Sequence, residues 1–308
     1  MDPIHRIAVA PHDHAWAAAM NEAVGRGGGT PSDLATAQGL IWLGASGPAL
    51  DATLHDGIRW VQLRSAGIEH FIASGNVDDS RMFGCTRGVY AETVAEHVLA
   101  LMLAGSRKLA FCARSTTWAS TAAEGRELRG ATVAIVGAGG IGRALIRLLQ
   151  PFAMTVIAVT RSGREVPGAT RNLPASALGD VWPVADFVVL AAPATADTAA
   201  LVDADVLRAM PAHAWLINVA RGSLIDTAAL VEALRRDEIA GAALDVTDPE
   251  PLPDGHPLWT LPNVLITPHV ANPPASHLRT LLPFIEANVA RVVAGETPEG
   301  LVDLSAGY

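Results

Sequence analysis

Short apolar runs alternate with segments of helical periodicity along the chain. In the first part, a helical pattern covers residues 13–24, and apolar runs lie at residues 6–10, 40–43, 60–63 and 82–85. Runs of this length, bounded by turn residues, are typical of buried strands. Because helical segments separate the strands, parallel β-α-β units are predicted.

The second part of the chain repeats this rhythm. Six further strands are predicted at residues 132–136, 155–160, 187–191, 215–218, 241–245 and 264–267. Helices are predicted between them at residues 140–151, 198–210 and 227–237. Asp226 is a good N-cap for the last of these helices, because a carboxylate can accept from the free N–H groups of a first turn.

Three segments frame these two series. A single long helix is predicted over residues 92–114, a polar connector over 115–130 and a final helix over 275–294, which is expected to cross back to the first series. We therefore expect an α/β protein with two Rossmann-like or flavodoxin-like domains, each built on a parallel sheet, and an active-site cleft between them. The expected boundaries are 1–96 plus 273–308 for the first domain and 97–272 for the second.

Composition and charge restrict the classes of partner. Half of the 308 residues are hydrophobic and 17% are charged, so a large core is expected. A formal net charge of −9 offers no electrostatic gain on nucleic acid. No apolar run is long enough for a membrane span, and the N-terminus lacks the apolar stretch of a signal peptide, so a cytoplasmic protein is expected. Cys85 and Cys112 have no metal-ligand spacing, and no metal is expected.

A glycine-rich turn follows the strand predicted at 132–136 and opens the next helix. In dinucleotide-binding folds, the first glycine of such a turn makes the tight bend and the second lets the backbone approach the pyrophosphate. The third lets helix and sheet pack closely, and the helix N-terminus supplies N–H groups to the anion. The sequence therefore predicts a dinucleotide site at Gly137, Gly139, Gly140, Ile141 and Gly142.

The next predicted strand ends in Thr160, Arg161 and Ser162. A site that prefers NAD usually has an acidic residue at this place, which accepts from the ribose 2′-OH. A guanidinium can instead bind a 2′-phosphate through charge-assisted contacts. These three residues are therefore expected to contact NADP(H). If Arg161 is instead an ordinary solvated surface charge, the enzyme is expected to take either NADP(H) or NAD(H).

Three motifs further along carry a guanidinium, a carboxylate and an imidazole: residues 218–226 with Arg221, residues 245–251 with Glu250, and Thr267-Pro-His269. Together with the glycine-rich turn and the stretches 61–68 and 88–96, they resemble the D-isomer-specific 2-hydroxyacid dehydrogenases. Within that family the chain is most similar to the glyoxylate/hydroxypyruvate reductases. The resemblance extends over most of the chain from about residue 58 onward and implies a substrate-binding first domain and a dinucleotide-binding second domain.

The resemblance also implies roles for these side chains. Arg221 would bind the substrate carboxylate and polarise the carbonyl, a task for which a planar fork is well shaped. His269 would be the acid/base, since an imidazole exchanges protons near neutral pH. Glu250 would orient the imidazole and favour its charged form.

Further contacts follow from the same resemblance. The backbone N–H groups of Ser65, Ala66 and Gly67 would meet the substrate carboxylate, beside Arg221 and His269. Asp245 matches a position near the nicotinamide, although a structural role at the end of its strand is the alternative. The other residues expected at the cofactor are Ala192, Pro193, Val219 and Ala220.

The expected activity is NAD(P)-dependent reduction of a small 2-oxo acid, glyoxylate-like or hydroxypyruvate-like, to a D-2-hydroxy acid. The resemblance also implies a homodimer built around the long helix. The apolar face of that helix fits an interface and an internal core equally well; it includes Val94, Val98, Leu101 and Met102. The alternative functions are an NAD(P)-sensing binding protein like the corepressors of this fold, and a formate- or phosphite-type dehydrogenase.

Overall fold

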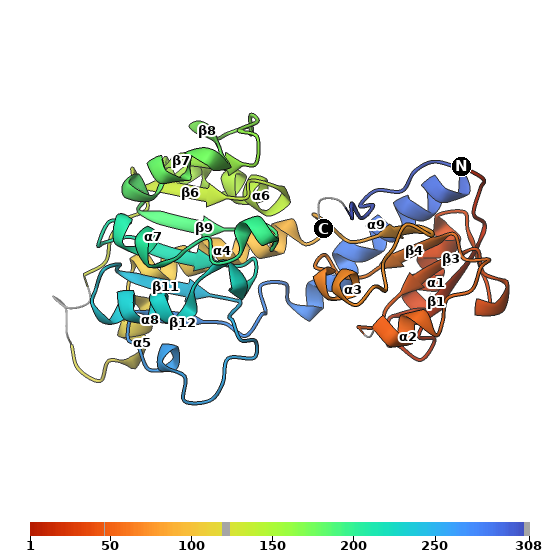
Figure 1. Cartoon of the computed structure of the whole chain (residues 1–308), viewed down its shortest axis with the longest axis horizontal. Helices are drawn as coiled ribbons and strands as arrows, with labels where there is room; N and C mark the ends of the chain where they lie inside the picture. Colours follow the sequence, from red (N-terminus) through yellow and green to blue (C-terminus); the bar gives the residue numbers. More distant parts are fainter. Residues whose placement is uncertain (46, 119–123, 305–308) are drawn as a thin grey trace. The chain divides into compact units, whose positions relative to one another are not determined.

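The computed structural model describes residues 1–45, 47–118 and 124–304, and the chain divides into two compact units (Figure 1). Unit 1 contains Met1–Tyr90 and Pro273–Tyr308, and unit 2 contains Ala91–Asn272. Residues 91–96 were expected in the first domain but belong to unit 2. The reason is that they form the first turns of the continuous helix α4 (Ala91–Ser106), which packs against other elements of unit 2.

Unit 1 is built on a parallel sheet with the strand order β2-β1-β3-β4-β5, the order of flavodoxin-like folds. Its strands are β1 (Arg6–Ala10), β2 (Thr30–Pro31), β3 (Gly39–Trp42), β4 (Trp60–Leu63) and β5 (Met82–Gly84). Its described helices are α1 (Ala17–Arg26), α2 (Gly47–Asp51), α3 (Glu69–Ala73) and α9 (Pro274–Val293).

Both faces of this sheet are buried, because successive side chains of a strand point to opposite sides. Ile7 and Val9 of β1 pack with residues of α1 and α9, whereas Ala8 packs on the other face with residues of α2 and α3. Leu281 and Ile285 of α9 are fully buried in the first of these clusters. The final helix therefore completes unit 1, to which it was expected to cross back.

Unit 2 contains a larger parallel sheet with the strand order β12-β11-β10-β9-β6-β7-β8. Its strands are β6 (Thr132–Val136), β7 (Thr155–Thr160), β8 (Arg171–Pro174), β9 (Phe187–Leu190), β10 (Trp215–Asn218), β11 (Gly241–Leu244) and β12 (Val264–Ile266). The chain runs outward from β6 to β8 and then returns to β9 on the other side of β6. This reversal of strand order is the place where open parallel sheets bind ligands.

Helices cover both faces of the unit 2 sheet. They are α4, α5 (Leu109–Arg114), α6 (Gly140–Leu149), α7 (Ala204–Ala209) and α8 (Thr227–Arg235). Residues of α7 and α8 share one buried cluster with Ala134, Val136, Val188 and Leu190 of the central strands. Helix α4 instead packs against α6, β10 and β11.

The prediction of one long helix over residues 92–114 is wrong, because this stretch forms two helices. Helix α4 ends at Ser106, and Lys108 adopts a left-handed conformation with φ of +50° before α5 begins. The carbonyl of Ser106 accepts a hydrogen bond of 2.7 Å from the backbone N–H of Arg126. The connector therefore takes a carbonyl that a continuous helix would have used internally, and the helix breaks there.

Two other expected helices are shorter than predicted. The helix expected from residue 13 begins at Ala17, because the side chain of His14 accepts from the N–H of Trp16 and holds a turn there. Of the helix expected over 198–210, only the part that forms α7 is helical. Asp203 caps α7 by accepting from two backbone N–H groups. Asp226 caps α8 as predicted, accepting from the N–H of Ala229. Sequence patterns missed β2, β8, α2 and α3.

Within the part of the chain that the structure describes, no helix has both the length and the apolar character that crossing a lipid bilayer requires.

Candidate active site

Most of the residues predicted for the cofactor and the chemistry follow the strands of unit 2 at one edge of its sheet. The glycine-rich turn follows β6, Thr160 ends β7, and Ala192 and Pro193 come just after β9. Val219 to Arg221 follow β10, Asp245 follows β11, and His269 follows β12. Because the strands are all parallel, their carboxyl ends lie along the same edge. Segments far apart in the sequence are thus brought to one place.

The glycine-rich turn has the geometry that its spacing predicted. Gly137 has φ of +93°, and a Cβ there would lie 2.4 Å from the backbone nitrogen of Ala192. A Cβ on Gly142 would lie 3.0 Å from Ile135 of β6, so the third glycine lets α6 approach its strand. A Cβ on Gly139 would meet nothing within 4 Å. Gly139 therefore borders open space at the N-terminus of α6, where free N–H groups favour an anion.

The remaining cofactor candidates differ in what their side chains can reach. Arg161 and Ser162 are exposed, just past the end of β7, but the side chain of Thr160 is buried. Ala192 and Pro193 are half-buried, whereas Val219 and Ala220 are buried. Of these residues, Arg161 alone offers a side-chain charge. Thr160, Val219 and Ala220 can meet a ligand chiefly through their backbone.

Arg221 is half-buried and extended, just before a short 3₁₀ turn at Gly222–Leu224. Asn218 fixes the backbone here, since its side chain accepts from the N–H of Ala220 and donates to the carbonyl of Arg221. A Cβ on Gly222 would lie 2.0 Å from the carbonyl carbon of Thr247. The absence of a side chain at Gly222 thus brings the segment with Arg221 against the loop that leads to Glu250.

Glu250 and His269 form the closest pair in the predicted set. Oε1 of Glu250 lies 2.7 Å from Nδ1 of His269, and both side chains are partly exposed. A carboxylate can only accept a hydrogen bond, so Nδ1 carries the hydrogen. The other ring nitrogen, Nε2, can then exchange a proton with a ligand. The carboxylate also accepts from the N–H of Thr247 at 3.4 Å. The pair can therefore present an oriented imidazole to a ligand.

The backbone of His269 is itself unusual, with φ of +53°. Its N–H donates to the carbonyl of Asp245 at 2.8 Å and to that of Thr267 at 2.9 Å. A left-handed conformation is uncommon for a residue other than glycine and marks a position held by its surroundings.

Asp245 provides much of that support. Its buried carboxylate accepts from the hydroxyl of Thr267 at 2.6 Å and from the N–H groups of Val270 at 2.9 Å and Ala271 at 3.1 Å. Burial by itself raises the pKa of Asp245, but these hydrogen bonds and one from His97 outweigh it and leave the pKa below its ordinary value. Asp245 anchors the His269 loop, so the structural alternative for this residue has direct support.

Sequence reasoning assigned no role to His97 of α4, which belongs to the same network. Its Nε2 lies 3.0 Å from the Thr267 hydroxyl and 3.5 Å from the Asp245 carboxylate. Because the hydroxyl already donates to Asp245, it accepts from His97, so Nε2 carries a hydrogen. The available signal was its position beside the buried Val94 and Val98, since a polar group on a buried face needs a partner.

The predicted substrate loop, Ser65 to Gly67, belongs to unit 1. It follows β4 directly and leads into α3. The N–H of Thr86 donates to the carbonyl of Ser65 at 3.0 Å, which fixes the start of the loop. Ala66 is exposed, and its two neighbours are half-buried.

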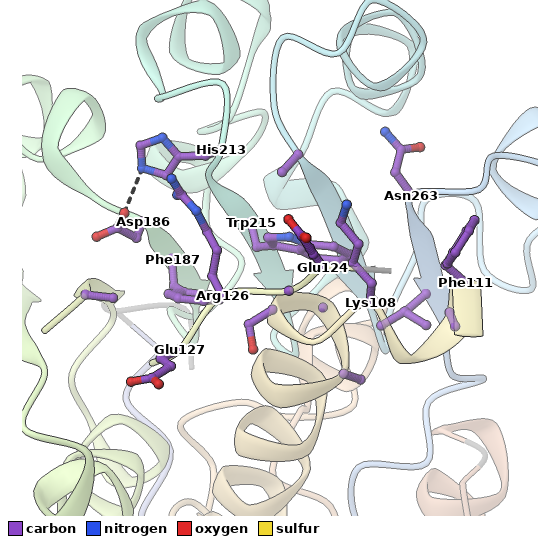
Figure 2. A pocket seen from close by; sticks show the side chains of 18 of the residues that line it. Lys108, Phe111, Glu124, Arg126, Glu127, Asp186, Phe187, His213, Trp215 and Asn263 are labelled. Atoms are coloured by element: carbon purple, nitrogen blue, oxygen red, sulfur yellow. Dashed lines mark hydrogen bonds and ion pairs between the residues drawn. The ribbon is translucent and has the colours of Figure 1, made fainter. Parts of the chain in front are cut away.

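A cavity of about 1160 Å³ lies at the opposite edge of the unit 2 sheet (Figure 2). It is lined by the first residues of β9, β10 and β12 and by parts of α5 and the connector. Figure 2 shows Trp215 in the middle of this cavity, with the pair of His213 and Asp186 at one side. Because dinucleotide folds bind at the carboxyl ends of their strands, this cavity is separate from the predicted active site.

Comparisons with known proteins agree with this geometry. Residues 99–271 match the model of the D-isomer-specific 2-hydroxyacid dehydrogenase NAD-binding domain. The chain is 34% identical over 226 residues to a glyoxylate reductase of Thermofilum pendens, covering 71% of this chain and 67% of that protein.

Two solved structures share the fold over nearly the whole chain. One is a D-isomer-specific 2-hydroxyacid dehydrogenase from Xanthobacter autotrophicus in complex with NADPH and MES, with a TM-score of 0.84, 27% identity and 100% of both chains covered. The other is an NADPH-dependent glyoxylate/hydroxypyruvate reductase from Sinorhizobium meliloti in complex with NADP and sulfate. It has a TM-score of 0.82 and 26% identity, covering 99% of this chain and 100% of that one. The chain therefore belongs to the D-isomer-specific 2-hydroxyacid dehydrogenases, a membership that supports an NAD(P)-dependent oxidoreductase acting on 2-hydroxy acids.

Proposed function

We propose that the protein reduces a small 2-oxo acid, glyoxylate or hydroxypyruvate being the model substrates, to the D-2-hydroxy acid with NADPH. The observation that carries this proposal is the pair of Glu250 and His269, 2.7 Å apart at the same sheet edge as the glycine-rich turn. An oriented imidazole near a dinucleotide site is what proton-coupled hydride transfer requires.

The residues at this edge fit a nicotinamide dinucleotide. The open space at Gly139 and the N–H groups of Gly140, Ile141 and Gly142 would hold the pyrophosphate. Ala192, Pro193, Val219 and Ala220 would line the rest of the path, mostly through backbone atoms. When bound, the cofactor supplies the hydride that reduces the carbonyl carbon.

His269 would supply the proton. Since Nδ1 donates to Glu250, the hydrogen on Nε2 of the imidazolium goes to the carbonyl oxygen as that oxygen gains negative charge. Glu250 would keep the ring in this orientation. In the oxidation direction, neutral Nε2 takes the hydroxyl proton back.

Arg221 would hold the substrate carboxylate and polarise the carbonyl. Its planar fork allows two parallel hydrogen bonds to a carboxylate. The backbone N–H groups of Ser65, Ala66 and Gly67 in unit 1 would bind a substrate carboxylate.

The decisive test is a panel of glyoxylate, hydroxypyruvate and pyruvate, assayed with purified protein and each cofactor. We expect NADPH-dependent turnover, which His269→Gln abolishes without loss of NADPH binding. His213→Gln, a matched change at the opposite sheet edge, is expected to leave turnover unchanged. If no oxo acid is reduced although the dinucleotide binds, the proposed activity is wrong and the protein is better explained as a binding protein.

Cofactor preference would rest on Arg161, the exposed charge past the end of β7. Arg161→Asp is expected to lower the ratio of kcat/KM with NADPH to that with NADH at least about tenfold, because a carboxylate repels the 2′-phosphate. Arg164→Asp, three residues away, is the matched surface control. An unchanged ratio in Arg161→Asp would remove this role.

We also propose a homodimer, but not through the face of α4 named above. Val94, Val98, Leu101 and Met102 are buried within unit 2. Apolar side chains are exposed instead just after α4: Leu109 is 52% exposed and Trp118 is 97% exposed. Contact with a second copy of the chain at these two side chains would remove apolar surface from water.

Light scattering on the purified protein would test the dimer. We expect the mass of a dimer for the native chain and a shift toward monomer for Leu109→Glu combined with Trp118→Ala. Val184→Glu changes a similarly exposed residue (48%) elsewhere on unit 2 and serves as the control. A native chain that is monomeric at micromolar concentration would contradict the proposal.

A further inference from the structure

Helix α4 carries two polar side chains that contact the loop of residues 267–272, which follows β12. The hydroxyl of Thr93 donates to Oδ1 of Asn272 at 3.1 Å. Nε2 of His97 lies 3.0 Å from the hydroxyl of Thr267. Since Thr267 and Asn272 are the first and last residues of this loop, the helix contacts the loop at both ends.

Helix α4 is a firm support for these contacts. Thr93 and His97 are four residues apart, so their side chains lie on the same face of the helix. The neighbouring Ala95 and Val98 are fully buried, and the helix packs against α6, β10 and β11. Both side chains therefore start from a helix that the core of unit 2 holds in place.

The contact with His97 sets the direction of a chain of hydrogen bonds. His97 donates to the Thr267 hydroxyl, which directs the single hydrogen of that hydroxyl to the carboxylate of Asp245, 2.6 Å away. The same carboxylate accepts from the N–H groups of Val270 and Ala271. The effect of His97 thus extends, through two other side chains, to the backbone that directly follows the proposed acid/base.

Burial makes this chain of hydrogen bonds sensitive to the loss of one donor. The side chain of Asp245 is 1% exposed and that of His97 is 21% exposed, with Nε2 3.5 Å from the carboxylate. Water has little access to replace a missing donor at a carboxylate so deeply buried. Without His97, the Thr267 hydroxyl is also free to turn away from Asp245.

The backbone of the loop would relax if its anchors were lost. His269 is held at φ of +53°, in a conformation that residues other than glycine seldom adopt. Such a conformation persists only where the surroundings impose it. Weaker anchoring would let the backbone move toward negative φ, and the imidazole would turn with it.

We propose that His97 and Thr93 are positioning residues of the proposed reaction, which hold both ends of the loop and so keep the imidazole of His269 in place for proton transfer. This inference rests on the proposed function and deepens it. The two side chains act through the loop and not on the reacting atoms.

Two substitutions of His97 separate a hydrogen-bond role from a packing role. His97→Leu fills the space but cannot donate, and we expect kcat for glyoxylate reduction to fall at least about tenfold while the Kd for NADPH changes less than about twofold. His97→Gln can place an amide donor near the position of Nε2 and should recover most of the lost kcat. If packing alone mattered, leucine would be tolerated at least as well as glutamine.

The imidazole of His269 can be observed directly by NMR of protein that carries isotope-labelled histidine. Its ring signals are assigned by their absence in His269→Gln. In His97→Leu we expect these signals to shift or broaden, and in His97→Gln to remain close to those of the native chain. Thr93→Val removes the second anchor with little change in shape and should act in the same direction. It carries the test if His97→Leu does not fold.

His213→Leu is the matched control, because it removes an imidazole that contacts the carboxylate of Asp186 at 2.7 Å at the opposite sheet edge. It should change neither kcat nor the His269 signals. If the native protein reduces glyoxylate and the anchor variants keep native kcat and native signals, or if glutamine is no better than leucine in place of His97, the inference is overturned and the proposed function stands. If no 2-oxo acid is reduced, the proposed function fails, and the His269 signals still decide whether the two anchors hold the ring.

Discussion

The carboxylate of Asp245 accepts a backbone hydrogen bond of 2.9 Å from Val270, the residue after the proposed acid/base. It accepts a second from Ala271 at 3.1 Å, and its own carbonyl accepts from the N–H of His269. One buried acid at the end of β11 therefore fixes three consecutive residues of the loop after β12. The proposed chemistry depends on how firmly that loop is held.

Asp245→Asn is expected to destabilise the protein in a pH-dependent way. Because the pKa of Asp245 is lowered in the folded state, its ionised form stabilises the fold above the unfolded pKa of about 3.9. That contribution is lost as the pH falls through the lower, folded value. We expect Tm to drop on the order of 5 °C at neutral pH and the difference from the native protein to narrow below about pH 4.

Melting curves of the two proteins between about pH 3 and pH 7 would check this linkage. Asp254→Asn, at an exposed position in the following loop, is the control and should match the native curve. A Tm difference that stays constant over the whole range would show that the charge of Asp245 is not what holds the loop.

Glu250→Ala should slow reduction because it releases the ring of His269. The carboxylate of Glu250 accepts from Nδ1 of His269 at 2.7 Å, and alanine offers no acceptor there. We expect kcat for reduction to fall at least about tenfold, with little change in the Kd for NADPH. Glu250→Gln is the matched control, because its amide oxygen can still accept from Nδ1 and should preserve more of the activity. Equal kcat in Glu250→Ala and the native protein would show that Glu250 does not position the ring.

Substitutions at two glycines of the cofactor turn should have different effects, one on the stability of the protein and the other on cofactor binding. Gly137→Ala forces a Cβ to within 2.4 Å of backbone at a φ of +93°, so the protein is expected to be destabilised. Gly139→Ala meets no neighbouring atom, so its Tm should remain near that of the native protein. Its methyl group would occupy the space proposed for the pyrophosphate, and the Kd for NADPH should rise at least about tenfold.

Calorimetry of unfolding and of NADPH binding on both variants would check this contrast. Native cofactor affinity in Gly139→Ala would place the pyrophosphate elsewhere.

Gly222→Ala should disturb the proposed active site by displacing the loop that leads to Glu250. The new Cβ would lie 2.0 Å from the backbone of Thr247, and backbone cannot move aside as a flexible side chain can. We expect the loop that carries Glu250 to shift, with lower Tm and a fall in kcat/KM of at least about tenfold. Ser223→Ala, at the exposed neighbouring position, is the control.

Crystal structures or melting curves, together with kcat/KM, would report the outcome for Gly222→Ala. Native stability and native activity would show that this close approach is not required.

Except for β8, the strands of unit 2 were predictable because most of their side chains are apolar on both faces of the sheet. The predicted bounds of β6, β7 and β10 agree with the structure. Strand β2, with two residues, is too short to show a periodicity. The residue with the left-handed conformation at the break is Lys108 and not a glycine, and the break involves a backbone contact between Ser106 and Arg126 that no local pattern shows.

Site residues that lie within a sequence motif were predictable. Site residues that only the fold brings together were not. Glu250 and His269 were paired by resemblance, and the structure brings their side chains together. The contact of His97 with Thr267 joins residues 170 positions apart. No spacing rule connects a residue on α4 with one after β12, so this contact appears only once both elements pack on the same sheet.

The anchoring of the loop by Asp245 sets a rule for anyone who builds chimeras from this scaffold. Grafting the segment around His269 from another dehydrogenase, or exporting it to one, would transfer amide donors whose acceptor lies outside the graft. A graft of this segment must therefore also include Asp245 and His97. Otherwise the graft would contain the imidazole, but nothing would fix the loop that orients it.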